Sequence, residues 1–198
     1  MAIVQVGSND GVSNDPIHHM LIKKKTANAL LIEADKANFK KLQSTYFKIK
    51  HRCKFENQIV GNGKPSVFYS INVKNARLDP SIPSFVKLEQ MHSLNKEVLE
   101  NCLDGILTPH LEEIQVETVL LETLLSQHKI NKVGLLHIDA EGSYLEILKP
   151  LIQRNLLPTL ILFEKRHLSN KDLMECTNLL AANCRLRYFE HDMLCILR

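Results

Sequence analysis

No run of about 18 apolar residues occurs in the chain, so the sequence offers no transmembrane helix. The N-terminus opens directly on apolar residues, without the basic region and cleavage site of a secretory signal. The cysteines are odd in number and form no Cys-x-x-Cys pair, so neither a disulfide framework nor a zinc site is indicated. We therefore expect an untargeted, cytoplasmic protein in a reducing compartment, without a membrane partner and without a bound metal.

The net positive charge is low, and the basic residues are dispersed along the chain. The net charge is +3, and cations gather only at Lys23–Lys25 and between Lys48 and Lys54. A nucleic-acid interface needs a contiguous stripe of cations, so we expect no nucleic-acid partner. The composition, 44% hydrophobic and 24% charged, is near the average for globular proteins. We expect one domain over residues 1–198, because two full domains would need a longer chain.

Short apolar runs alternate with segments of helical period, a pattern typical of an α/β protein. The last two apolar segments, Arg185–Phe189 and Met193–Leu197, are separated by too few residues for a crossover, so they must be antiparallel. The predicted fold is a Rossmann-like, mostly parallel seven-stranded sheet with helices on both faces and a C-terminal antiparallel hairpin. We expect parallel strands at 2–6, 29–33, 55–60, 133–138 and 159–163, and helices at about 15–25, 35–48, 144–154 and 169–182, the caps being Asp15, Asp35 and Ser169.

Between these elements, residues 62–128 are expected to form a substrate-specific insertion. Gly61–Gly63 predicts a hairpin that joins the preceding strand to Ser66–Ile71. A loop should follow, then a helix over Phe85–Leu103, a strand over Leu111–Thr118 and a short helix to His128. Apolar spacing in this segment supports more than one period.

Polar residues follow the predicted parallel strands, where open α/β sheets bind ligands. The first turn, Val6–Gly11, contains Gly7, Asn9 and Asp10, and its glycines permit close approach of a ligand. The dinucleotide fingerprint Gly-x-Gly-x-x-Gly is absent, and Asp10 would repel a phosphate. Glu33 ends the second strand, where an acidic side chain accepts hydrogen bonds from ribose hydroxyls. Asn57 and Gln58 would border an adenine, although turn polarity explains them equally well.

Candidate catalytic groups lie at the later strand ends and near the first turn. His137 and Asp139 alternate with apolar residues and should share one face of a strand, although a histidine in such a strand is often a core residue. Glu164 ends the next strand and is a candidate catalytic residue, and His18, near the first turn, is a candidate base. Glu141 would either face a ligand or favour its helix N-terminus. Asp139 and Glu141 carry oxygen ligands that suit Mg²⁺, but no metal is predicted.

Three blocks carry a family resemblance. They are Val6–Gly11 with Asn14–Ile17, then Leu31–Asp35 with Asn38–Phe39, and His137–Gly142 with Tyr144–Leu148. In this order, at strand ends, they resemble the FkbM family of methyltransferases. The resemblance implies a class I methyltransferase fold, S-adenosylmethionine as methyl donor, and O-methylation of secondary-metabolite or saccharide hydroxyls.

By position in that family, Gly7, Asp10 and Glu33 correspond to cofactor residues, and Asp139 and Glu141 belong to its Asp-x-Glu-Gly block. Asp139 is predicted to serve both cofactor and acceptor. The chain departs from such folds by beginning on the first strand, without a preceding helix that covers the cofactor.

The leading hypothesis is an S-adenosylmethionine-dependent methyltransferase acting on a hydroxyl of a small molecule or saccharide. The alternative is a non-catalytic binding module that retains the fold. A nicotinamide oxidoreductase is disfavoured by the first turn and by the terminal hairpin.

Overall fold

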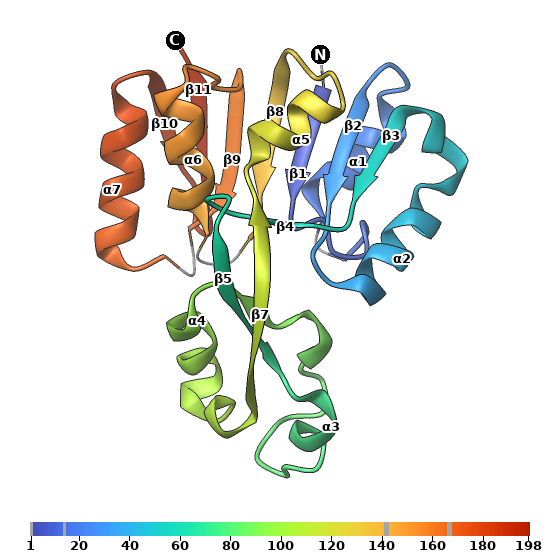
Figure 1. Cartoon of the computed structure of the whole chain (residues 1–198), viewed down its shortest axis with the longest axis vertical. Helices are drawn as coiled ribbons and strands as arrows, with labels where there is room; N and C mark the ends of the chain where they lie inside the picture. The colour runs from blue at the N-terminus through green and yellow to red at the C-terminus, as the bar shows by residue number, and fades with distance from the viewer. Residues whose placement is uncertain (1, 14, 141–142, 166–167) are drawn as a thin grey trace.

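The computed structural model describes residues 2–13, 15–140, 143–165 and 168–198. Its main feature is a seven-stranded sheet in the order β10-β11-β9-β8-β1-β2-β3 (Figure 1). Five neighbouring strands are parallel, whereas β11 runs antiparallel to both β9 and β10, which confirms the predicted sheet and its terminal hairpin. The strand predicted over residues 55–60 is wrong in its bounds, because only residues 55 and 56 of it pair within this sheet. The strands are β1 (Ala2–Val6), β2 (Asn28–Ile32), β3 (Cys53–Glu56), β8 (Val133–Ile138), β9 (Leu160–Glu164), β10 (Cys184–Tyr188) and β11 (Asp192–Leu197).

Helices cover both faces of this sheet, as predicted. On one face lie α5 (Leu121–Gln127), α6 (Tyr144–Gln153) and α7 (Asn170–Ala181); on the other lie α1 (Pro16–Lys23) and α2 (Lys36–Thr45). The three predicted caps are confirmed, because each side chain accepts from a backbone amide of its first turn: Asp15 from Ile17, Asp35 from Asn38 and Ser169 from Asp172. None of the helices in the described ranges is long and apolar enough to span a bilayer.

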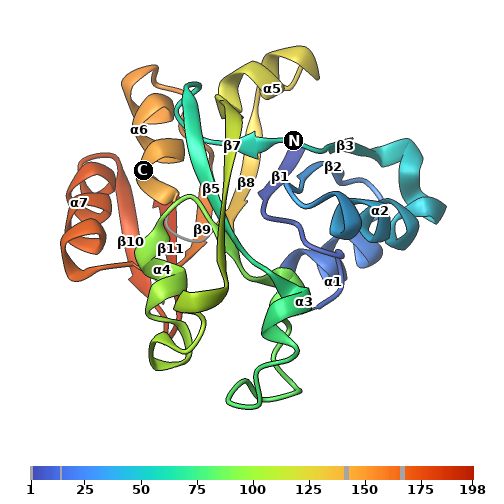
Figure 2. The ribbon, with the colours of Figure 1, turned by 60° about the horizontal axis from the view of Figure 1, so that its bottom comes forward.

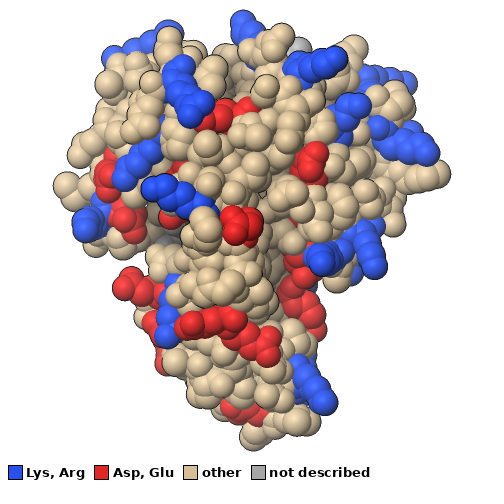
Figure 3. All heavy atoms as spheres, viewed as in Figure 1, with Lys and Arg blue, Asp and Glu red and all other residues tan. Residues whose placement is uncertain are grey.

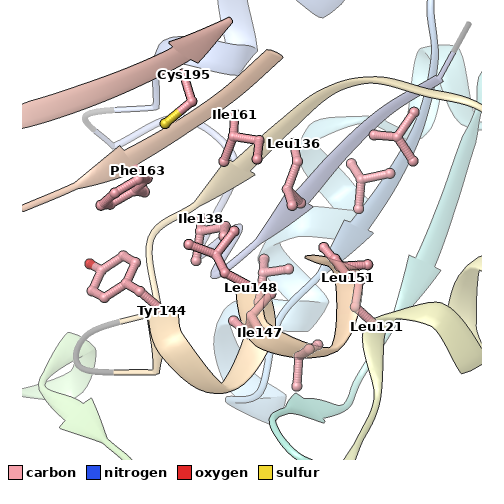
Figure 4. Close-up of a cluster of buried hydrophobic side chains, with 14 of the residues drawn as sticks. Leu121, Leu136, Ile138, Tyr144, Ile147, Leu148, Leu151, Ile161, Phe163 and Cys195 are labelled. Carbon is pink, nitrogen blue, oxygen red and sulfur yellow. The ribbon is translucent and has the colours of Figure 1, made fainter. Parts of the chain in front are cut away.

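The larger hydrophobic core lies between the sheet and α5, α6 and α7 (Figure 4). Leu136, Ile138 and Ile161 point from the strands toward Leu148 on α6, and all four are fully buried. The rings of Tyr144 and Phe163 lie 5.5 Å apart. This packing fixes the strand ends, because it holds β8, β9 and α6 as one unit.

A second sheet, in the order β4-β7-β5-β6, occupies the segment between β3 and α5. Figures 1 and 2 show its long strands β5 and β7 side by side, extending away from the main sheet. The predicted hairpin at Gly61–Gly63 is wrong: β4 pairs in parallel with β7, and β5 pairs with β7 rather than with β4. The strands are β4 (Ile59–Val60), β5 (Pro65–Ile71), β6 (His92–Ser93) and β7 (Leu111–Val119).

The helix predicted over Phe85–Leu103 is also wrong. The segment contains a 3₁₀ turn, strand β6, a short helix and a second 3₁₀ turn, where Leu103 and Asp104 have positive φ values of 51° and 54°. Its apolar residues are buried in different places. Leu88 lies in a small core with Ile71, whereas Val98 and Leu99 are the buried residues of α4. The helical elements are α3 (Val73–Ala76), α4 (Lys96–Glu100), η1 (Phe47–Arg52), η2 (Leu88–Gln90), η3 (Cys102–Gly105) and η4 (Thr108–His110).

We call residues 59–119 the insertion. Its small core, built on Ile71, Ala76, Ile82, Leu88 and Leu107, is separate from the two cores that flank the main sheet. The insertion therefore adds a packed unit of its own beside the carboxyl edge of the main sheet.

Candidate functional site

A cavity lies at the carboxyl edge of the main sheet, between the ends of β1, β2 and β8 and the insertion. Gly7, Asn9, Glu33 and Asp139, all predicted site residues, line it together. The full lining is Val6, Gly7, Asn9, Ile32, Glu33, Ala34, Gln58, Ile59, Val60, Phe68, Gln90, His92, Ser93, Leu94, Asp139, Ala140 and Ser143.

The turn after β1 forms one wall of this cavity. Gly7 and Gly11 have φ values of +79° and +75°, and Asn9 has a φ of 47°. A Cβ atom at Gly7 would lie 2.0 Å from the carbonyl oxygen of Asp139, so only glycine permits β1 and β8 to end so close together. This close approach brings the Asp139 backbone to the first turn, and both Gly7 and Asp139 line the cavity.

Glu33 follows β2 and is only 3% exposed. Its Oε2 accepts from the amide of Asn9 at 2.7 Å, and its Oε1 accepts from the amide of Asp35 at 2.9 Å. Burial raises the pKa of Glu33 to about 7, and the nearby carboxylates of Asp35 and Asp139 act in the same direction, while the two amide bonds oppose it. Burial therefore makes ionisation of Glu33 unfavourable. Each of its two oxygens accepts one amide and keeps a further lone pair for a donor in the cavity.

The raised pKa predicts how stability depends on pH. Between about 4.5 and about 7 the folded protein retains a proton on Glu33 that the unfolded chain releases, so the free energy of unfolding should fall as pH rises through this window. Urea unfolding over a pH series measures this dependence. We expect Glu33→Gln to lose that part of the pH profile; an identical profile in the variant would contradict the prediction.

Two predicted cofactor residues do not line the cavity. Asp10 turns back into its own loop, where its carboxylate accepts from the amides of Val12 and Ser13 and from the Ser13 hydroxyl. Burial opposes ionisation of Asp10, but these bonds outweigh it and lower its pKa. The Asn57 side chain donates to the carbonyl groups of Glu33 and Ala34 at 2.8 and 2.9 Å. It holds the turn that follows β2.

The candidate bases other than Asp139 also lie away from the cavity lining. His18 is on α1, its ring 5.7 Å from that of Tyr46. Glu164 ends β9 and pairs in register with Asp192 on β11. His137 is 4% exposed on the α1 side of β8, and burial lowers its pKa. Both features are those of a histidine in the hydrophobic core. Glu141 lies outside the described residues.

The insertion supplies part of the lining that the sequence did not reveal: Phe68, Gln90, His92, Ser93 and Leu94. Gln90 donates to the Asn9 side chain at 3.3 Å, and His92 Nε2 lies 3.8 Å from Glu33 Oε1. The mistaken helix over Phe85–Leu103 concealed Gln90, His92, Ser93 and Leu94. No local signal distinguishes them, since their placement depends on the pairing of β5 with β6 and β7.

The ionisable side chains that line the cavity are acidic or histidine. Glu33 and Asp139 line it, and none of its described lining residues is lysine or arginine. Figure 3 shows further acidic side chains on the insertion below the main sheet. Such a site favours a cationic ligand over a phosphate-bearing one. Among the described residues, no group of three or more His, Cys, Asp or Glu side chains is arranged to hold a metal ion.

A seven-stranded sheet of this strand order, with an acidic cavity at its carboxyl edge, has the architecture of a class I methyltransferase. The family model for the methyltransferase FkbM domain matches residues 5–189, so the chain belongs to the FkbM methyltransferase family. This finding confirms the resemblance carried by the three sequence blocks.

A solved structure of the same family agrees with the fold. FkbM methyltransferase from Methylobacillus flagellatus KT is 15% identical to this chain, with a TM-score of 0.57 over 99% of this chain and 44% of its own. The chain therefore spans less than half of that protein's length. The S-adenosylhomocysteine-bound methyltransferase PaMTH1 from Podospora anserina is 10% identical, with a TM-score of 0.48 over 100% of this chain and 71% of its own. None of the curated proteins compared with the chain matches it.

The residues of the cavity fit S-adenosylmethionine, the cofactor that family membership implies. Glu33 offers buried acceptors for hydroxyl donors, and Asp139 offers a negative charge. Gly7 and Asn9 line the cavity on the side of the first turn, so the backbone of this turn lies within reach of a ligand. Each of these features matches a part of the cofactor: its ribose, its cationic groups and its flexible methionine chain.

Proposed function

We propose that this methyltransferase uses S-adenosylmethionine to methylate a hydroxyl group of a small molecule or saccharide. The observation that carries the proposal is the pair of carboxylates, Glu33 and Asp139, in a cavity without a described lysine or arginine. A cationic sulfonium donor is favoured there, whereas a nicotinamide dinucleotide would bring phosphates against the same charges.

Within this proposal, Glu33 binds the ribose, because its buried oxygens are oriented by the amides of Asn9 and Asp35. Gly7 and Asn9 provide the wall for the methionine portion, and Gln58 and Ile59 border the adenine. Bound S-adenosylmethionine supplies an activated methyl group. The protein must then align the acceptor and take up its hydroxyl proton.

Asp139 is the proposed base, because it is the predicted catalytic residue that lines the cavity. Its place after β8 is fixed by a hydrogen bond from its own amide to the carbonyl of Val6 at 2.9 Å. Glu164 ends the adjacent strand β9, outside the cavity lining, and is assigned no step in this proposal. His18 lies on α1 beside Tyr46 and has no assigned step in this proposal.

The first test is calorimetric titration with S-adenosylmethionine and S-adenosylhomocysteine, with NADH as the control. We expect the two sulfur compounds to bind and NADH not to bind. A screen of hydroxylated acceptors with radiolabelled donor then tests turnover, and Asp139→Asn should lower the rate while cofactor binding persists. Binding without turnover on any acceptor would favour the non-catalytic module, and NADH binding alone would contradict the proposal.

A further inference from the structure

The insertion reaches the main sheet at the cavity through residues 88–93, which comprise η2 and β6. Gln90 Nε2 donates to Asn9 Oδ1 at 3.3 Å, so this segment is tied to the first turn. Strand β6 is held by β5, where Ser70 pairs with His92. Residues 88–93 therefore form a fixed wall opposite the ends of β1 and β2.

His92 is the residue of this wall that faces Glu33. Its Nε2 atom lies 3.8 Å from Glu33 Oε1, too far for a direct hydrogen bond. Its ring lies 5.3 Å from that of Phe68, which fixes its position from the other side. The side chains of His92 and Glu33 are 22% and 3% exposed, so both are largely withdrawn from water.

The hydrogen-bonding capacities of the two groups are complementary. Each Glu33 oxygen already accepts one backbone amide and retains a further lone pair. Burial lowers the pKa of His92, although the carboxylate of Asp35 opposes this, so the ring is neutral near pH 7 and one nitrogen carries a proton. A hydroxyl between them can donate its proton to Glu33 and accept from His92.

We propose that His92 is a second ribose-binding residue, which donates from Nε2 to a ribose hydroxyl of the cofactor while that hydroxyl donates to Glu33. The inference rests on the proposed function, because it assumes that the ribose lies at Glu33. It assigns the insertion a direct part in holding the cofactor. His92 acts as a binding residue and takes no part in the transfer of the methyl group.

Titration of two ligands tests the assignment: S-adenosylhomocysteine and its analogue without the two ribose hydroxyls. In His92→Phe the ring against Phe68 is retained but the donor is lost. We expect this variant to bind S-adenosylhomocysteine about tenfold more weakly than the unaltered chain, the value of one hydrogen bond to a polar group. Its affinity for the dihydroxyl-free analogue should be unchanged.

A second variant, His92→Gln, restores an N–H donor near the same position and should recover part of the lost affinity for S-adenosylhomocysteine. Equal weakening of both ligands by His92→Phe, or no weakening of either, would overturn the assignment while leaving the proposed function intact. Failure of the unaltered chain to bind S-adenosylhomocysteine would instead overturn the proposed function, and this inference with it.

Discussion

Replacing Glu33 with glutamine should weaken binding of S-adenosylhomocysteine about 100-fold, because hydrogen bonds to a buried charged acceptor contribute about 1.5–3 kcal/mol each. The carboxylate has two acceptor oxygens, each already oriented by a backbone amide, from Asn9 or from Asp35. Glutamine offers one acceptor oxygen and an NH₂ group. Its NH₂ group would face one of those backbone amides, so two donors would oppose each other there. The same NH₂ group could not accept a hydrogen bond from a ribose hydroxyl.

Calorimetric titration at pH 8, where Glu33 is ionised, measures the effect. The matched control is Glu56→Gln, the same substitution at the end of the adjacent strand β3, where the carboxylate contacts His128 at 2.6 Å and does not line the cavity. We expect the control to bind as the unaltered chain does. Retained affinity in Glu33→Gln, or equal losses in the two variants, would contradict the ribose-binding role of Glu33.

Gly7→Ala should reduce the free energy of unfolding by about 3 kcal/mol or more, since a left-handed backbone and an overpacked contact both oppose the new methyl group. The Cβ atom would lie 2.0 Å from the carbonyl oxygen and 2.7 Å from the carbonyl carbon of Asp139. Both are backbone atoms, so the clash cannot be relieved by a side-chain rotation. Displacing the turn would also move Asp139, and cofactor affinity should fall with stability.

Gly105→Ala provides the matched control. Gly105 has a similar φ of +86°, but the nearest heavy atom to its new Cβ would be 3.6 Å away. It should lose only the cost of the left-handed backbone, about 1–2 kcal/mol. The difference between the two variants in urea unfolding isolates the clash with Asp139. Equal destabilisation would show that the close approach of β1 and β8 contributes nothing.

The main sheet could be predicted because its strands carry their own signals. Residues 2–6 and 133–138 are apolar apart from Gln5 and His137, as expected of strands buried on both faces. The helices that follow β2 and β9 are capped by Asp35 and Ser169. The C-terminal hairpin followed from loop length alone. These features are local, so neighbouring residues were sufficient to identify them.

The insertion could not be predicted in the same way, because long-range pairing decides its structure. Val60 pairs with Val119, far along the chain, instead of with the strand that follows Gly63. Asn95 caps α4 and so marks a helix start within the segment that was expected to be one helix. Apolar residues at helical spacing there pack in unrelated places, and no local rule separates them.

The residues of the candidate site differ in the same way: those on the main sheet could be predicted, and those on the insertion could not. Gly7, Asn9, Glu33 and Asp139 meet because the carboxyl ends of parallel strands share one edge of a sheet. Asp10 lies outside the lining because the amides of its own loop satisfy its carboxylate. Sequence position placed the residues of the main sheet, but it gave no means of finding His92, which reaches the cavity from the insertion.

The insertion has a small core of its own, and residues 88–93 connect that core to the cofactor cavity. Leu88 shows the connection, because it packs against Ile71 and Ala76 while Gln90 and His92, two and four residues later, line the cavity. Substitutions in this core can therefore reshape one wall of the cavity without disturbing the packing of the seven-stranded sheet.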